Sequence, residues 1–153
     1  MRPAPLYQRQ KNVRTWLKED RILIESYLED PVHFIVLTLE VHQERRSIES
    51  LDVRFWRSPY PDLCPLSAHI YSGLVGEVIK PGFSRTVKQL VPAVEGCVHI
   101  NSLLKEAADA LMQSFFYMKG DRTEGSERRR ILREEAGLKN ICLSYSDKEN
   151  PDV

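Results

Sequence analysis

The residues with the clearest chemical potential are Cys97 and His99, which stand two positions apart in the stretch EGCVHINSLLKEAADAL (95–111). A thiol and an imidazole this close could bind a metal ion, or the imidazole could serve as base for a nucleophilic thiol. A long helix is expected to begin here, and the dipole of a helix N-terminus favours a thiolate. The alternative is that Cys97 packs in the core, because cysteine is among the most buried residue types.

Two further donors fall at the ends of expected elements. His33 begins an expected strand, and Cys64 lies in the proline-rich loop SPYPDLCP (58–65). A tetrahedral zinc site takes four thiolate or imidazole donors, and iron–sulfur centres use the same donor types. We therefore predict a metal site of His33, Cys64, Cys97 and His99 that holds zinc or an iron–sulfur cluster, with no catalytic residue assigned. The chain has no Cys-x-x-Cys pair, and His33 could instead bond a backbone group at the strand end.

Strands are expected to precede helices along the chain. The segments 21–28, 33–42 and 47–57 are rich in β-branched and apolar residues, and the last two alternate with a period of two. Short polar links between them predict a three-stranded antiparallel sheet. Apolar spacing then predicts helices near 65–77, 84–91 and 98–118, the last over about five turns. The long helix should bury Leu104, Ala108, Leu111 and Phe115 against the sheet. This order predicts an α+β fold in which helices cover one face of the sheet.

The expected organisation has three parts. Residues 1–15 are polar and contain prolines, and we expect a loose N-terminal arm. Residues 16–120 should form a single α+β domain. Residues 121–153 should be an extension that is partly helical and ends in a disordered tail, SDKENPDV (146–153).

Composition excludes several classes of protein. The 22 basic residues balance 22 acidic ones, which argues against a general nucleic-acid or lipid surface. The arginines of ERRRILREE (127–135) are flanked by acidic residues, so we expect a solvated helical face there. No apolar run reaches the roughly 18 residues of a membrane span, and no secretory signal is visible. Three cysteines, Cys64, Cys97 and Cys142, are too few for a disulfide scaffold, which favours free thiols or metal ligands in the cytoplasm.

Several motifs together resemble a bacterial family known as domain of unknown function 2889. They are Leu28-Glu29-Asp30 with His33, Pro59-Tyr60-Pro61-Asp62-Leu63-Cys64, Leu74-Val75-Gly76 with Gly82-Phe83, and Gly96-Cys97-Val98-His99. The likeness covers about residues 12 to 118. The spacer between Tyr60 and Cys64 is one residue longer than in the family, and Phe34-Ile35 replaces the Asp-Met that often follows the family's histidine. The resemblance implies no established activity.

A more distant likeness concerns the order of elements and ligands. Three strands, a cysteine loop and a Cys/His pair before the last long helix are similar to the NifU/IscU-type iron–sulfur scaffold fold. Here His33 stands where that fold has cysteine, and the final pair runs Cys97-x-His99 rather than His-Cys. The resemblance implies a NifU/IscU-like sandwich, and histidine in place of cysteine favours a stable site such as zinc, or no metal at all. Fold alone does not carry function.

Three functions stay open on the sequence. The first is a metal-binding or iron–sulfur-related protein. The second is a non-catalytic interaction module that binds another protein and has core cysteines. The third is an enzyme with Cys97 or Cys64 as nucleophile and a nearby histidine as base, for which Asp30 could be the orienting group. Whether the chain is an enzyme is undecided, with a non-enzymatic role favoured.

Overall fold

A computed structural model describes residues 3–120, 125–135 and 137–147 of the chain. It divides into two compact units, Met1–Leu111 and Met112–Val153. The first unit contains a sheet and helices, in that order, and confirms the predicted α+β class with an antiparallel sheet followed by helices. Most of the predicted disordered tail (146–153) lies outside the described residues.

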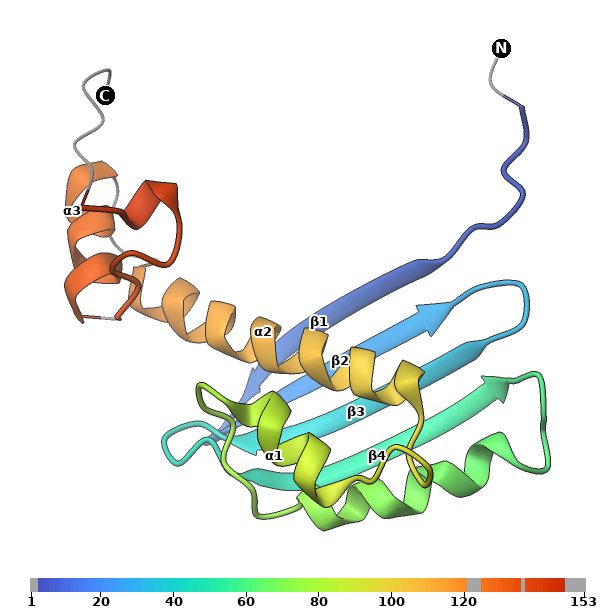
Figure 1. Cartoon of the computed structure of the whole chain (residues 1–153). Helices are drawn as coiled ribbons and strands as arrows, with labels where there is room; N and C mark the ends of the chain where they lie inside the picture. Colours follow the sequence, from blue (N-terminus) through green and yellow to red (C-terminus); the bar gives the residue numbers. More distant parts are fainter. Residues whose placement is uncertain (1–2, 121–124, 136, 148–153) are drawn as a thin grey trace. The chain divides into compact units, whose positions relative to one another are not determined.

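The sheet has four strands rather than the three that we expected. They are β1 (Gln10–Lys18), β2 (Arg21–Glu29), β3 (Phe34–His42) and β4 (Ile48–Arg57), in spatial order β1-β2-β3-β4. Each pair of neighbours is antiparallel, so the sheet is a meander (Figure 1). Alternation of buried and partly exposed residues in β2 and β3 follows the period of two that predicted them.

The expectation of a loose arm over residues 1–15 is wrong from Gln10 onward, because β1 begins there. This strand is mostly polar and exposed, so its alternation is weak. Antiparallel pairing along the whole length of β2 stabilises β1. A two-residue turn, in which Glu19 has a φ of 55°, connects the two strands. Lys11 also donates a hydrogen bond to Ser102 in the long helix, at 2.5 Å. β1 therefore holds the residues before it close to the start of that helix.

One face of the sheet forms the core of the first unit. Its side chains are fully or almost fully buried, and they are Ile22, Ile24, Leu28, Ile35, Leu37, Leu39, Val41 and Ile48. Burial of this apolar surface is the main source of stability for such a layer. The opposite face is only partly buried, as expected for an antiparallel sheet covered on one side.

Two short helical segments follow β4. The 3₁₀ helix η1 (Cys64–Leu74), green in Figure 1, replaces the helix predicted over 65–77 and contributes the buried residues Tyr71 and Leu74. Helix α1 (Phe83–Leu90) confirms the helix predicted over 84–91 and buries Phe83 and Val87. Gly82, with a φ of 90°, is the N-cap residue of α1.

The long helix α2 (Val98–Gly120) confirms the strongest periodic pattern of the sequence. Within the first unit it packs a row of buried side chains over the sheet: Ile100, Leu103, Leu104, Ala107 and Leu111 (Figure 1). We predicted burial of Leu104 and Leu111 correctly. Ala108 and Phe115, which we also expected to be buried, are only partly buried, and Ala107 rather than Ala108 holds the inward position.

The second unit contains the rest of α2, α3 (Gly125–Arg130), the π-helical turn η2 (Ile131–Glu135) and the 3₁₀ turn η3 (Leu143–Tyr145). Leu132 and Leu138 are its buried apolar residues among those described. Arg130 pairs with Glu127 at 2.8 Å, as the charge pattern predicted. Within the described part of the chain, no helix combines the length and apolar character needed to cross a bilayer.

Ser26 is a polar residue in the apolar face of β2. It is 1% exposed, and among the described residues its hydroxyl has no hydrogen-bond partner. Since a buried unsatisfied hydroxyl destabilises the native state, we expect Ser26→Ala to raise the free energy of unfolding by about 1 kcal/mol. Urea unfolding would measure it, with the exposed Ser50→Ala as control. A loss of stability in Ser26→Ala beyond that of the control would contradict this account of the core.

Candidate functional site

The site begins at the connection between β2 and β3, where Asp30 organises a tight turn. Its Oδ1 accepts the backbone N–H groups of Val32 and His33, at 2.9 and 2.8 Å, and its own N–H donates to the His33 carbonyl at 2.9 Å. Aspartate commonly bonds the backbone two or three residues ahead in this way. Arg57 at the end of β4 donates to the Asp30 carbonyl at 2.8 Å. The turn is therefore held by the Asp30 side chain from within and by Arg57 of β4 from outside.

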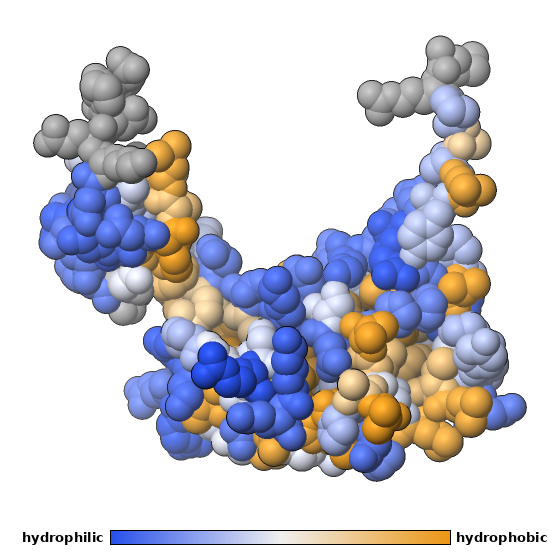
Figure 2. All heavy atoms as spheres, viewed as in Figure 1, coloured by the Kyte–Doolittle hydropathy of each residue, from blue (hydrophilic) through white to orange (hydrophobic). Residues whose placement is uncertain are grey.

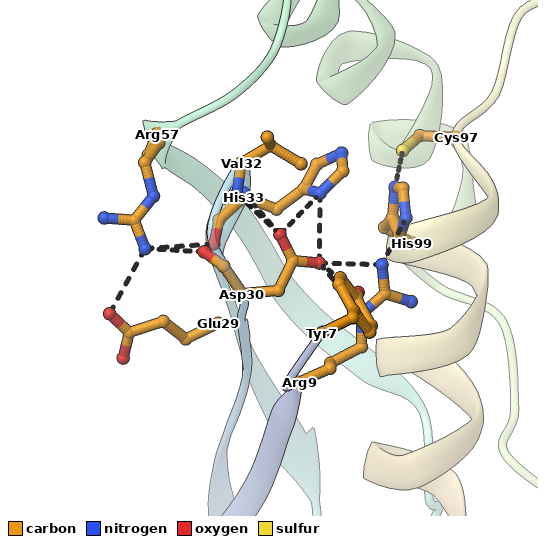
Figure 3. Close-up of polar contacts among 9 residues, drawn as sticks. All are labelled: Tyr7, Arg9, Glu29, Asp30, Val32, His33, Arg57, Cys97 and His99. Carbon is orange, nitrogen blue, oxygen red and sulfur yellow. Dashed lines mark hydrogen bonds and ion pairs between the residues drawn. The ribbon is translucent and has the colours of Figure 1, made fainter. Parts of the chain in front are cut away.

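The Asp30 carboxylate also collects side-chain donors from the segment before β1. Tyr7 Oη donates to Oδ2 at 2.8 Å, and Arg9 Nε donates to the same oxygen at 2.9 Å (Figure 3). The Asp30 side chain is fully buried. Burial alone would raise its pKa, but hydrogen bonds from Tyr7, the Val32 N–H, Arg9 and His33 outweigh it and hold the pKa far below its usual range. Asp30 is therefore a buried, permanently ionised carboxylate.

His33 is oriented by this carboxylate. Its Nδ1 lies 3.0 Å from Asp30 Oδ1 and 3.1 Å from Oδ2, so an ionised Asp30 requires Nδ1 to carry a proton and to donate it. In the neutral ring, Nε2 then holds the lone pair and points away from the carboxylate, on the side of Cys97 and His99 (Figure 3). The His33 ring lies against that of His99, with 4.1 Å between centroids.

His99, in the first turn of α2, contacts both Arg9 and Cys97. Arg9 Nη2 lies 3.3 Å from Nε2 of His99, and Cys97 Sγ lies 3.8 Å from Nδ1 (Figure 3). A guanidinium can only donate, so Nε2 accepts and the neutral ring carries its proton on Nδ1, facing the sulfur. Burial, followed by the charges of His33 and Arg9, lowers the pKa of His99. His99 is thus a neutral donor toward Cys97 at pH 7.

Tyr71 fixes the position of Cys97. The Cys97 N–H donates to Tyr71 Oη at 2.8 Å, and that hydroxyl lies 2.8 Å from Asn101 Oδ1, to which it can donate. Tyr71 is fully buried, and burial raises its pKa to about 12, so its hydroxyl keeps its proton at neutral pH. The 3₁₀ helix η1, which carries Tyr71, therefore anchors the backbone from which α2 begins.

Gly96 allows the close approach that this anchor requires. A Cβ at position 96 would lie 2.6 Å from Val91 Cγ1 and 3.1 Å from Tyr71 Oη. We expect Gly96→Ala to lower the free energy of unfolding by about 1–3 kcal/mol, because Val91 is buried and must shift. Gly73→Ala is the matched control, since a Cβ at position 73 meets no atom within 4 Å. Equal stabilities of the two variants in urea unfolding would contradict the predicted clash.

A pocket opens beside Cys97, between η1 and the loop that leads into α2. Cys64 and Cys97 both line it and are both half-buried free thiols. The other lining side chains are predominantly apolar, with Leu66 and Val98 among them. The thiol of Cys97 is thus placed between an imidazole pair and a pocket.

The structure brings together three of the four predicted ligands, His33, Cys97 and His99. His33 contacts His99 and His99 contacts Cys97, whereas Cys64 only lines the same pocket as Cys97. Across residues 3–120, 125–135 and 137–147, no set of three or more His, Cys, Asp and Glu side chains has an arrangement that could hold a metal ion. A metal bound by the four residues therefore stays a prediction.

Sequence reasoning missed Tyr7 and Arg9 and underestimated Asp30. Tyr7 and Arg9 lay in the segment expected to be loose, so nothing suggested that they contact Asp30. Asp30 had been considered only as an orienting group, which is the role that its contact with His33 supports. Arg9 directly precedes β1, whose pairing with β2 begins at Gln10 opposite Glu29, and the sequence pattern gives no signal for this pairing. Cys142 is exposed and lies in the second unit.

Comparison with known proteins gives one match. The model of the family described as "Protein of unknown function (DUF2889)" matches residues 8–113, which include β1–β4 and every residue of the site from Arg9 to His99. Searches of curated proteins and of solved structures found no match, so the likeness to the NifU/IscU-type fold gains no support. The family match confirms the first resemblance, and the chain belongs to the DUF2889 family.

Proposed function

We propose that the protein acts through a nucleophilic thiol, Cys97, which forms a covalent bond with an electrophilic small molecule bound in the adjoining pocket. The observation that carries the proposal is the contact of Cys97 Sγ with His99 Nδ1, at 3.8 Å, beside a second histidine held by a buried carboxylate. A nucleophile, a base and a group that orients the base are the parts that thiol catalysis requires.

Asp30, His33 and Cys97 take the roles of orienting group, base and nucleophile. Nε2 of His33, on the side of the ring that faces Cys97 (Figure 3), accepts the thiol proton through one intervening water molecule. Sγ forms a bond to the electrophilic atom as the leaving group departs with the bonding electrons. The His33 imidazolium then gives its proton to the leaving group. The ionised Asp30 stabilises the imidazolium between these steps, because it accepts Nδ1–H at 3.0 Å.

His99 and Arg9 assist by stabilising the thiolate. Arg9 donates to Nε2 of His99 and so keeps a proton on Nδ1, which faces the sulfur. The rings of His33 and His99 lie 4.1 Å apart between centroids with their planes tilted by 45°. Burial first, and then the charges of His33 and Arg9, lower the pKa of His99. When His33 takes up the thiol proton, His99 therefore stays neutral, and its Nδ1–H continues to donate to the Cys97 sulfur.

The proposal is tested by labelling the three cysteines of the intact protein with iodoacetamide at pH 7 and following each by peptide mass spectrometry. Cys142 is exposed and serves as an internal reference, whereas Cys97 is half-buried. An activated Cys97 should react at least about tenfold faster than Cys142, because reactivity follows thiolate character rather than exposure alone. Cys97 reacting no faster than Cys142 would leave the interaction module as the better hypothesis.

A metal site is the second candidate, and one observation favours it. Metal-bound histidines commonly donate their second ring nitrogen to a carboxylate, as His33 does to Asp30. Cys64, Cys97 and His99 would supply the remaining donors for zinc or an iron–sulfur cluster. A metal on Nδ1 of His99 would require a proton on Nε2, which Arg9 opposes because it also only donates.

The two candidates predict different metal contents. Protein purified anaerobically without a metal-affinity tag should contain neither zinc nor iron in stoichiometric amount if Cys97 acts as a free thiol. A metal site predicts about one equivalent, a thermal midpoint that rises with added zinc, and loss of both in Cys97→Ser. Met112→Leu, a substitution in α2 outside the donor set, should leave the metal content unchanged.

A further inference from the structure

The pocket beside Cys97 is surrounded by large apolar side chains that solvent reaches. Leu63 is 66% exposed, Leu66 62%, Val94 94% and Val98 75%. Two of them come from the end of the proline-rich loop and from η1, and two come from the segment around the start of α2. Figure 2 shows hydrophobic surface gathered over this region of the first unit. Clustered exposed apolar side chains of this kind commonly mark a binding surface.

The charge of the pocket argues against an anionic occupant. Glu95 is the acidic residue of the lining, and its carboxylate opposes a phosphate or carboxylate group. His69, also in the lining, directs Nδ1 at the Leu66 carbonyl, which engages that nitrogen as a donor within η1. Recognition in the pocket must therefore come mainly from apolar contact, for which an uncharged hydrocarbon group is the matching chemistry.

The position of the thiol relates this apolar surface to the chemistry. Cys97 belongs both to the lining of the pocket and to the cluster of Asp30, His33 and His99, because it lines the pocket and its thiol contacts His99. A molecule that reacts at Sγ must therefore place the substituent next to its reactive atom against the pocket wall. Leu66 and Val98 are then the side chains placed to contact that substituent.

We propose that the electrophile attacked by Cys97 carries an uncharged aliphatic chain, and that the pocket selects it through Leu63, Leu66, Val94 and Val98. This inference rests on the proposed function of Cys97 and specifies its substrate class. The chain lies in the pocket while Sγ bonds to the atom that bears it, and the leaving group departs with the electron pair. Burial of each methylene removes apolar surface from water, strengthens binding and so raises the second-order rate constant for reaction at Cys97.

The test uses alkyl methanethiosulfonates with methyl, butyl and hexyl groups. The Cys97 thiolate attacks the thiol sulfur of the reagent, a disulfide to the alkylthio group forms, and methanesulfinate leaves. Rates at Cys97 are read by peptide mass spectrometry of the full-length protein and divided by the rates of glutathione with the same reagents. We expect the normalised rate to rise at least about tenfold from methyl to hexyl. A polar diethylene-glycol chain similar in length to hexyl should give no such rise.

Substitutions locate the selectivity. Leu66→Ser and Val98→Ser alter exposed side chains, so both proteins should fold, and each should reduce the hexyl-to-methyl ratio at least about threefold. Leu17→Ser is the matched control, because Leu17 is 59% exposed on β1 and is not among the lining residues of the pocket. It should leave the ratio unchanged.

The outcomes separate the two proposals. A methyl-reagent rate at Cys97 no higher than that of glutathione overturns the nucleophilic thiol, and the inference with it. A fast methyl reaction with no normalised gain for hexyl overturns the aliphatic selectivity alone. An equal gain for the polar chain also overturns it, because length rather than apolar character would then set the rate. If Leu17→Ser also lost the rate gain from methyl to hexyl, the assignment of the chain selectivity to this pocket would be contradicted.

Discussion

Asp30→Asn is expected to lower the free energy of unfolding by about 2–4 kcal/mol. The carboxylate is fully buried and accepts hydrogen bonds from Tyr7, Arg9, His33 and two backbone N–H groups. Asparagine keeps one acceptor oxygen but removes the charge that pairs with Arg9, at 2.7 Å, and leaves this site with unpaired donors. Urea unfolding at pH 7 measures the loss. Asp52→Asn, an exposed ion-pair residue on β4, should change stability by less than about 1 kcal/mol.

The same carboxylate predicts how stability depends on pH. Its pKa in the folded protein is held far below that of the unfolded chain, so its contribution is fully present above about pH 5. The contribution decreases as the pH falls below about 4, where the unfolded chain takes up a proton that folded Asp30 resists. Wild type should therefore lose more stability than Asp30→Asn between pH 5 and pH 3, because the variant lacks this proton uptake. Parallel losses in the two proteins would contradict a buried ionised Asp30.

His33→Gln is expected to slow the reaction of Cys97 with iodoacetamide about 100-fold at pH 7. The variant removes the ring whose Nδ1 bonds Asp30 and whose Nε2 is the proposed base, and a general base commonly contributes at least this much. Peptide mass spectrometry gives the rate at Cys97 separately from that at Cys142. The rate at Cys142 should not change, because it lies in the second unit and outside the site.

His42→Gln supplies the matched control for that prediction. His42 is the last residue of β3 and accepts backbone N–H groups of Glu44 and Arg45 through Nδ1, so it has a local structural role far along the strand from His33. It should leave the rate at Cys97 within about twofold of wild type. If His33→Gln and His42→Gln slow Cys97 equally, loss of fold stability rather than loss of a base explains the effect.

Much of the fold was predictable because its apolar residues repeat with clear periods. The alternation in β3 and the three- and four-residue spacing in α2 place Leu37, Leu39, Leu104 and Leu111 in the core, as expected. β1 was missed because an edge strand exposed on both faces needs little apolar alternation. The turn residue Glu19 also gives no glycine or asparagine signal for the hairpin, although its φ is positive. Pairing with β2, a tertiary effect, determines this strand.

The thiol and imidazole residues of the site could be predicted from the sequence, but the hydrogen bonds that connect them to the rest of the protein could not. Cys97 and His99 are close in sequence, and His33 stands at a strand end, so a cluster could be expected. The roles of Arg9 and Tyr7 depend on the register of β1, which the sequence pattern does not specify. Arg9 matters most, because its donor at Nε2 of His99 places the ring proton on Nδ1, the nitrogen that faces Cys97. This contact shifts our preferred interpretation from a metal ligand set toward a thiol.

A covalent adduct on Cys97 tests the central claim most directly. Wild-type protein is mixed with p-nitrophenyl acetate, quenched in acid within seconds, and mapped by peptide mass spectrometry. The thiolate attacks the carbonyl carbon, a thioester forms, and p-nitrophenolate leaves, so the account predicts one acetyl group on Cys97 and a matching burst of p-nitrophenol. Cys97→Ser should show neither signal. Acetylation confined to Cys64, Cys142 or lysines, with Cys97 unmodified, would contradict the assignment of Cys97 as the nucleophile.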